Sequence, residues 1–80
     1  MKIFIVGATG RMGGEIRRLI GENKKLQFVG GLGEKRSAAD GIEADFPKAP
    51  KGIDVVIDFS GAELFTKTLE WCAKHQLPLL

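Results

Sequence analysis

The sequence predicts an α/β fold in which a parallel β-sheet carries helices on its faces, and two observations support this prediction. Residues 2–32 contain strand-like, glycine-rich, helix-like and strand-like segments in that order, which is the βαβ arrangement. Residues 53–75 add a further strand-like run followed by a second helical pattern. Because a βαβ connection is right-handed in nearly all known proteins, the predicted sheet is parallel.

Composition limits the class of protein. With 80 residues, 44% hydrophobic and 28% charged, the chain is typical of one small globular domain. It contains no run of about 18 apolar residues that could span a membrane. The net charge of +2 does not indicate a nucleic-acid partner, and the single cysteine excludes an internal disulfide. We therefore expect a cytoplasmic protein with neither a membrane nor a nucleic acid as partner.

The first half of the chain contains three predicted elements. Residues 2–6 form a short apolar run that stops at Gly7, as a buried parallel strand does. Residues 11–22 show helical spacing, with Arg17 and Arg18 expected to point away from the sheet. Residues 26–32 read as a second strand. The apolar residues expected to face the sheet from the helix are Met12, Ile16, Leu19 and Ile20.

The second half begins with an aperiodic connection over residues 33–52, with one short strand or turn expected around 42–46. Residues 53–59 are rich in β-branched side chains and predict a third strong strand. A helix follows over 62–75, and residues 78–80 resemble the start of another strand. We therefore expect the domain to be truncated at residue 80. The predicted inner face of this helix consists of Phe65, Leu69, Cys72 and Ala73.

Three glycines lie between the first strand and the first helix, in the segment GATGRMG. Gly7 permits a sharp turn, Gly10 leaves room for a pyrophosphate, and Gly13 allows close packing of the helix on the sheet. The amides of the first helical turn would then face the phosphates. A turn used only for chain reversal is the alternative, but the flanking strands favour a Rossmann-like NAD(P)-binding domain. The GxxGxxG spacing is a variant of the commoner GxGxxG.

Charged residues near the predicted loops are candidates for cofactor contacts. Arg11, at the mouth of the helix, is expected to pair with a phosphate, and the less favoured alternative is a solvated side chain with no partner. Glu34 follows the second strand, where an acid often binds ribose hydroxyls, and Lys35 with Arg36 are placed for a 2′-phosphate. All three are alternatively ordinary loop charges, so the sequence leaves NADH and NADPH both open.

Several other residues have a functional and a structural interpretation. Phe59 is expected beside the cofactor at the carboxyl end of the third strand. For Ser60 we favour an N-cap role with Glu63 as its capping-box partner. We interpret Cys72 as a small buried hydrophobe, and we expect His75 to be a surface cation near the end of its helix. Trp71 is expected to pack or to contact another domain. Without clustered ligands, no metal site is predicted.

Three stretches together resemble one family: VGATGRMG at residues 6–13, VVIDFS at 55–60, and LEWCAKH at 69–75 leading to LPL at 77–79. The chain resembles dihydrodipicolinate reductase, also called 4-hydroxy-tetrahydrodipicolinate reductase, over essentially its whole length. One departure is that Gly33 stands where the family often has an acid, with Glu34 one position later. The resemblance and the loop positions together give this set of cofactor-binding candidates: Gly7, Ala8, Thr9, Gly10, Arg11, Met12, Glu34 and Phe59.

The resemblance implies NAD(P)H-dependent reduction of 4-hydroxy-tetrahydrodipicolinate, a small-molecule substrate of the diaminopimelate and lysine pathway. It implies that residues 1–80 are the N-terminal part of a dinucleotide-binding domain. Family catalytic residues would lie beyond Leu80, so the catalytic domain is absent from this chain and the segment alone is expected to be inactive. The resemblance also implies a homo-oligomer, commonly a tetramer.

Two other functions remain as alternatives. The segment VGATGRMG also resembles atypical short-chain dehydrogenase-like proteins, which would place a further strand and helix before residue 53. A non-catalytic nucleotide-sensing module is the second alternative, since nucleotide binding alone would satisfy the same motif.

Overall fold

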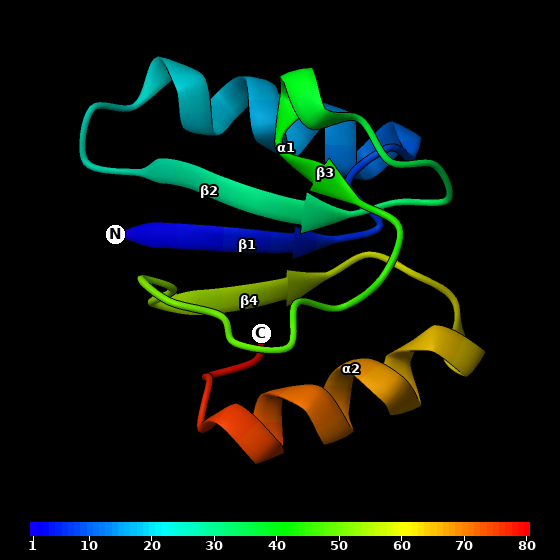
Figure 1. The fold of residues 1–80 in the computed structure, drawn as a ribbon. Helices are drawn as coiled ribbons and strands as arrows, with labels where there is room; N and C mark the ends of the chain where they lie inside the picture. Colours follow the sequence, from blue (N-terminus) through cyan, green and yellow to red (C-terminus); the bar gives the residue numbers. More distant parts are fainter.

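The computed structural model describes all residues from 1 to 80 and shows one sheet with a helix on each face (Figure 1). The four strands are all parallel, in the order β3-β2-β1-β4. The predicted α/β class with a parallel sheet and flanking helices is therefore confirmed. The elements are β1 (Lys2–Val6), α1 (Arg11–Glu22), β2 (Gln27–Leu32), the short 3₁₀ helix η1 (Ala38–Asp40), β3 (Ile42–Glu43), β4 (Val55–Asp58) and α2 (Ala62–His75).

The sheet separates two hydrophobic clusters because successive side chains of a strand point to opposite faces. Phe4 and Val6 of β1 face α2, where they pack with Trp71 and Cys72 among others. The alternate residues of β1 belong to the cluster on the α1 side, together with Ile20. Both clusters are anchored on β1, which is the central buried strand.

The local predictions agree closely with the structure. The first strand and both helices have the predicted bounds, whereas β2 and β4 are shorter than predicted. The expected short element around 42–46 is β3, which pairs with β2 as an edge strand. Leu79 forms a parallel bridge with Val56 of β4, as expected for the start of a further strand.

The predicted inner face of α1 is partly wrong. Met12 and Leu19 are 58% and 48% exposed, while Gly13 and Ile20 are buried. Arg17 does not point away, because its guanidinium lies over the Phe28 ring at 5.9 Å from the centroid. Gly13 explains this difference. Because α1 approaches the glycine turn most closely at Gly13, the side of the helix that carries Gly13 faces the sheet. A hydrophobicity pattern cannot detect a face that begins with glycine.

The predicted inner face of α2 is also wrong in part. Phe65 and Leu69 are largely exposed, and the buried residues are Thr68, Trp71 and Cys72. Thr68 can be buried because its hydroxyl donates to the Leu64 carbonyl at 3.0 Å. A polar residue thus occupies a core position that the pattern had given to an apolar one.

Trp71 is the main anchor of α2, which confirms the packing role expected for it. Its indole Nε1 donates to the Pro47 carbonyl at 2.8 Å, and its ring lies about 5 Å from the rings of Phe4 and Phe46. These contacts tie the connection before β4 to the helix. Neither α1 nor α2 is long and apolar enough to cross a membrane.

Candidate functional site

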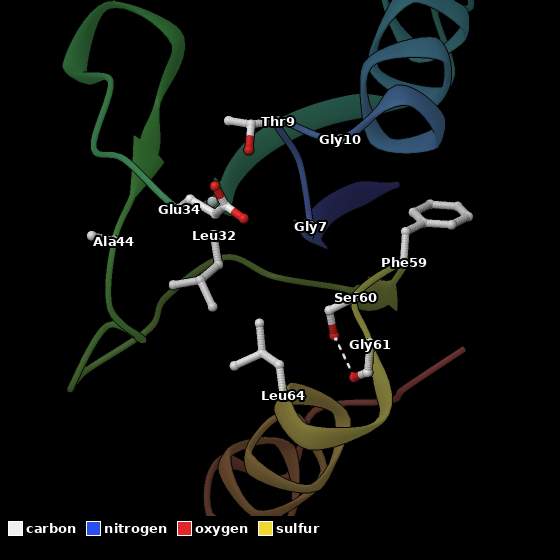
Figure 2. Close-up of a pocket in the computed structure, with 11 residues that line it drawn as sticks. Gly7, Thr9, Gly10, Leu32, Glu34, Ala44, Phe59, Ser60, Gly61 and Leu64 are labelled. Atoms are coloured by element: carbon white, nitrogen blue, oxygen red, sulfur yellow. Dashed lines mark hydrogen bonds between the residues drawn. The ribbon is translucent and has the colours of Figure 1, made fainter.

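A cavity of about 530 Å³ opens at the carboxyl edge of the sheet, where β1, β2 and β4 end (Figure 2). In open parallel sheets this edge is where ligands bind. The volume lies within the range of small-molecule sites. The lining residues are Gly7, Thr9, Gly10, Leu32, Gly33, Glu34, Ala44, Phe59, Ser60, Gly61 and Leu64.

Two glycines of the first turn are required by the fold itself. Gly7 has a φ of 83°, and its amide and that of Ala8 donate to the Leu32 carbonyl at 2.8 and 2.9 Å. A Cβ at Gly13 would lie 2.2 Å from the Gly7 carbonyl oxygen. A side chain at position 13 would therefore push α1 off the sheet, as the close-packing role predicted for this glycine implies.

Gly10 differs from these two glycines. It is the N-cap of α1 with an ordinary φ of −73°, and a Cβ there would meet only the Gly7 carbonyl oxygen, at 3.5 Å. The fold therefore tolerates a side chain at this position. Because Gly10 lines the cavity, the missing side chain leaves space that a ligand can use.

The start of α1 presents backbone donors that the protein does not use. The amides of Thr9, Arg11, Met12 and Gly13 donate to no acceptor in the chain, and Gly10 provides no side-chain cap. The first turn also contains no acidic residue that would compete for them. Free amides combined with the positive end of the helix dipole are suited to binding an anion such as a phosphate.

The opposite side of the cavity carries a carboxylate. Figure 2 shows the Glu34 side chain between Thr9 and Leu32, and no ion pair engages it. A Cβ at position 33 would lie 2.7 Å from Cγ2 of Thr9, so a side chain there would require the Thr9 side chain to move.

The turn between β4 and α2 corrects the prediction for Ser60. Its hydroxyl and its amide both donate to Oδ1 of Asp58, at 2.5 and 2.6 Å. The N-cap of α2 is Gly61, which has no side-chain cap bond, so the predicted capping box with Glu63 is wrong. Because the Ser60 hydroxyl is hydrogen-bonded to Asp58, it does not accept a hydrogen bond from an amide of α2.

Phe59 lines the cavity, but its ring packs with the hydrophobic cluster on the α1 side of the sheet. In Figure 2 the ring points away from Ser60 and Leu64. Its backbone carbonyl carbon would lie 3.1 Å from a Cβ at Gly7, so the two strand ends are in close contact. Phe59 therefore helps to shape the turn that holds Gly7.

The structure brings five of the eight candidate cofactor residues to the cavity: Gly7, Thr9, Gly10, Glu34 and Phe59. Ala8 is fully buried, and its contribution is to hold the turn. Arg11 and Met12 are exposed at the start of α1 and lie outside the lining. The roles of all eight in cofactor binding remain predictions.

Sequence reasoning did not select several other lining residues, namely Leu32, Gly33, Ala44, Gly61 and Leu64. Leu32 and Gly61 had a usable signal, because each lies where a strand ends or a helix begins at the same sheet edge. Ala44 had none, since its place depends on the pairing of β3 with β2.

The remaining reactive side chains lie away from the cavity. Cys72 is buried, as expected, and burial together with the nearby Asp58 carboxylate raises the pKa of its thiol. His75 is in the last turn of α2, edge-on to Trp71 at 6.0 Å between ring centroids. The chain contains no cluster of three or more potential metal-ligating side chains.

Comparison with known proteins gives a family assignment. The family described as "Dihydrodipicolinate reductase, N-terminus" matches residues 1–80. The chain belongs to this family. Similar curated proteins include the 4-hydroxy-tetrahydrodipicolinate reductase of Xanthomonas euvesicatoria pv. vesicatoria, 37% identical over 87 residues, and that of Zymomonas mobilis subsp. mobilis, 35% identical over 80 residues. The resemblance found in the sequence is thus confirmed.

These comparisons cover all of this chain but only part of each relative. The matches cover 100% of the chain, against 36% of the Xanthomonas protein and 31% of the Zymomonas protein. The chain therefore spans about a third of the length of these relatives. Membership in a reductase family supports a pyridine nucleotide as the cofactor, without distinguishing NADH from NADPH.

Proposed function

We propose that residues 1–80 are the N-terminal part of a dinucleotide-binding domain that holds NADH or NADPH for a reductase. The complete protein would reduce 4-hydroxy-tetrahydrodipicolinate to tetrahydrodipicolinate in the diaminopimelate and lysine pathway. The observation that carries this proposal is the group of unused amides at the start of α1, next to a cavity at the carboxyl edge of a parallel sheet. Family membership supplies the identity of the reaction.

Each part of the cavity then has a chemical task. The free amides of Thr9, Arg11, Met12 and Gly13 would hold the diphosphate, and the exposed Arg11 side chain would supply a positive charge nearby. Glu34 would accept hydrogen bonds from ribose hydroxyls. The cofactor supplies the hydride, and this chain positions it. Substrate-binding and proton-donating residues would lie outside residues 1–80.

Replacement of Gly10 tests the proposal. Because the fold tolerates a Cβ at this position, Gly10→Val should remain folded while its side chain blocks the approach of a diphosphate to the amides. We expect the affinity for NADH and NADPH, measured by calorimetric titration, to fall at least about tenfold. The nucleotide affinity of Gly10→Ala should lie between that of the unsubstituted chain and that of Gly10→Val.

Gly14→Ala is the matched control. It adds a methyl group four residues along the same helix, where no atom lies within 4 Å of the new Cβ, and Gly14 does not line the cavity. It should bind nucleotide as tightly as the unsubstituted chain. Equal binding by Gly10→Val and Gly14→Ala, with both folded by circular dichroism, would refute the role given to the glycine turn.

We also propose that the complete protein is cytoplasmic and forms a homo-oligomer, with a tetramer expected from the resemblance to its family. The absence of nucleic acid and membrane as partners belongs to the same proposal. The short-chain dehydrogenase-like alternative is disfavoured because only η1 and the two-residue β3 lie between β2 and β4. A purely nucleotide-sensing module is disfavoured by the reductase names of the relatives.

A further inference from the structure

The loop that joins β2 to β3 carries charges of both signs beside the Glu34 side of the cavity. Residues 33–46 contain four acids and two bases, and the bases are Lys35 and Arg36. Neither base lines the cavity, whereas Glu34 does. A 2′-phosphate, which distinguishes NADPH from NADH, would therefore meet a carboxylate before it met a cation.

Arg36 already has a partner. Its Nε donates to Oε2 of Glu43 at 3.1 Å, and the side chains of the pair are 66% and 47% exposed. Arg36 is thus the base whose planar guanidinium is best suited to a phosphate, and it is directed towards β3 instead.

Backbone hydrogen bonds hold the segments that carry Arg36 and Glu43 close to each other. Ser37 and Ile42 bridge the two arms of the loop through two hydrogen bonds of 2.8 and 2.9 Å. The amide of Gly33 donates to the Glu43 carbonyl at 2.9 Å, which holds the end of β3 next to the end of β2. Because these bonds bring residues 36 and 43 together, less entropy is lost when their side chains pair.

We propose that this chain prefers NADH to NADPH, and that Glu43 strengthens the preference by holding Arg36 away from the position of a 2′-phosphate. The proposal rests on the proposed function, since it concerns the adenosine side of the same cavity. Glu34 binds the free ribose hydroxyls and repels a phosphate there. Glu43 is a positioning residue, because it acts through Arg36.

Titration of the chain with NADH and NADPH is the first measurement. We expect NADH to bind at least about fivefold more tightly than NADPH. The variant Glu43→Gln should release Arg36 and raise the affinity for NADPH about fivefold, as expected for loss of an exposed pair, with less than about a twofold change for NADH. ADP-ribose and its 2′-phosphate repeat the comparison at the adenosine end alone.

A double-mutant cycle separates the release of Arg36 from the simple removal of a negative charge. In the Arg36→Leu background, Glu43→Gln should no longer improve NADPH binding. Asp45→Asn is the matched control, because it removes an acid two residues after Glu43 that forms no ion pair, and it should leave the NADH to NADPH ratio unchanged within about twofold.

Each alternative outcome has a definite meaning. Equal or tighter binding of NADPH by the unsubstituted chain would overturn the preference. The role of the ion pair would be overturned if Glu43→Gln raised the affinity for NADPH in the Arg36→Leu background as well. It would also be overturned if Asp45→Asn raised the affinity for NADPH by as much as Glu43→Gln does. Binding of neither nucleotide would instead overturn the proposed function, so the two failures are distinguishable.

Discussion

The two turns that end β1 and β4 have similar N-cap residues but differ in the acidic side chains beside them. Each leads from the carboxyl end of a strand into a helix whose N-cap is a glycine, with φ and ψ of −73° and 172° at Gly10 and −77° and 172° at Gly61. Neither glycine has a side-chain cap bond. Both turns line the same cavity.

The difference lies in what fills each turn. The first turn contains no acid, and its free amides are available to a ligand. The second turn contains Asp58, whose Oδ1 accepts hydrogen bonds from the amide and hydroxyl of Ser60, while Oδ2 is buried without a partner. The first helix start has no carboxylate beside it and is suited to an external anion, whereas Asp58 and Glu63 place two carboxylates beside the start of the second.

The largest expected effect concerns the packing of the first turn. Gly13→Ala places a Cβ 2.2 Å from the Gly7 carbonyl oxygen, so the free energy of unfolding should fall by about 3 kcal/mol or more. Urea unfolding followed by circular dichroism measures this change. Gly14→Ala, the neighbouring helical position with open space, should instead stabilise the chain by about 0.5 to 1 kcal/mol. Similar effects of the two substitutions would contradict the close approach of α1 to the turn.

A medium effect is expected in the second turn. Asp58→Ala leaves the amide and hydroxyl of Ser60 without their acceptor, so the free energy of unfolding should fall by about 1 to 3 kcal/mol. Asp58→Asn keeps an acceptor oxygen at this place, so its free energy of unfolding should fall by less than that of Asp58→Ala. Nucleotide affinity should not fall in folded Asp58→Asn. A tenfold loss of NADH binding in that variant would show that the second turn, and not only the first, holds the cofactor.

The smallest effect is a pH dependence at Cys72, below the second turn. Burial first, and the Asp58 charge second, raise the pKa of this thiol above its ordinary value. The folded state thus favours the protonated thiol, and its contribution to stability is present below the pKa of the unfolded chain and is lost as pH rises through the folded pKa. As the pH is raised into the alkaline range, the urea midpoint of unfolding should therefore fall less in Cys72→Ala than in the unsubstituted chain. Labelling by a thiol reagent at neutral pH should be at least about tenfold slower in the folded chain than in urea.

Much of the fold was predictable because its signals are local. The run that ends at Gly7, the helical spacing after Arg11 and the β-branched run before Asp58 each lie within one element. The bounds of both helices and of β1 were correct for this reason. The glycine spacing also located the cavity, because the carboxyl ends of parallel strands share one edge.

The errors arose where an element's neighbours decide the outcome. Gly13 determines the inner face of α1 although its hydropathy gives no such signal, and Thr68 replaces an apolar residue inside α2 because its hydroxyl bonds to its own helix. Ser60 does not cap α2 because its hydroxyl donates a hydrogen bond to Asp58 at the end of β4. None of these contacts follows from residue type and spacing alone.

The sequence by itself determined the class of fold, the order of its elements and the presence of a glycine turn suited to a diphosphate, since periodicity and backbone freedom are properties of short segments. Only the tertiary structure decided which glycine is free to face a ligand and that Arg36 is paired with Glu43. The physical reason is that steric contact and ion pairing depend on distances between segments, which the chain acquires only when the sheet has formed.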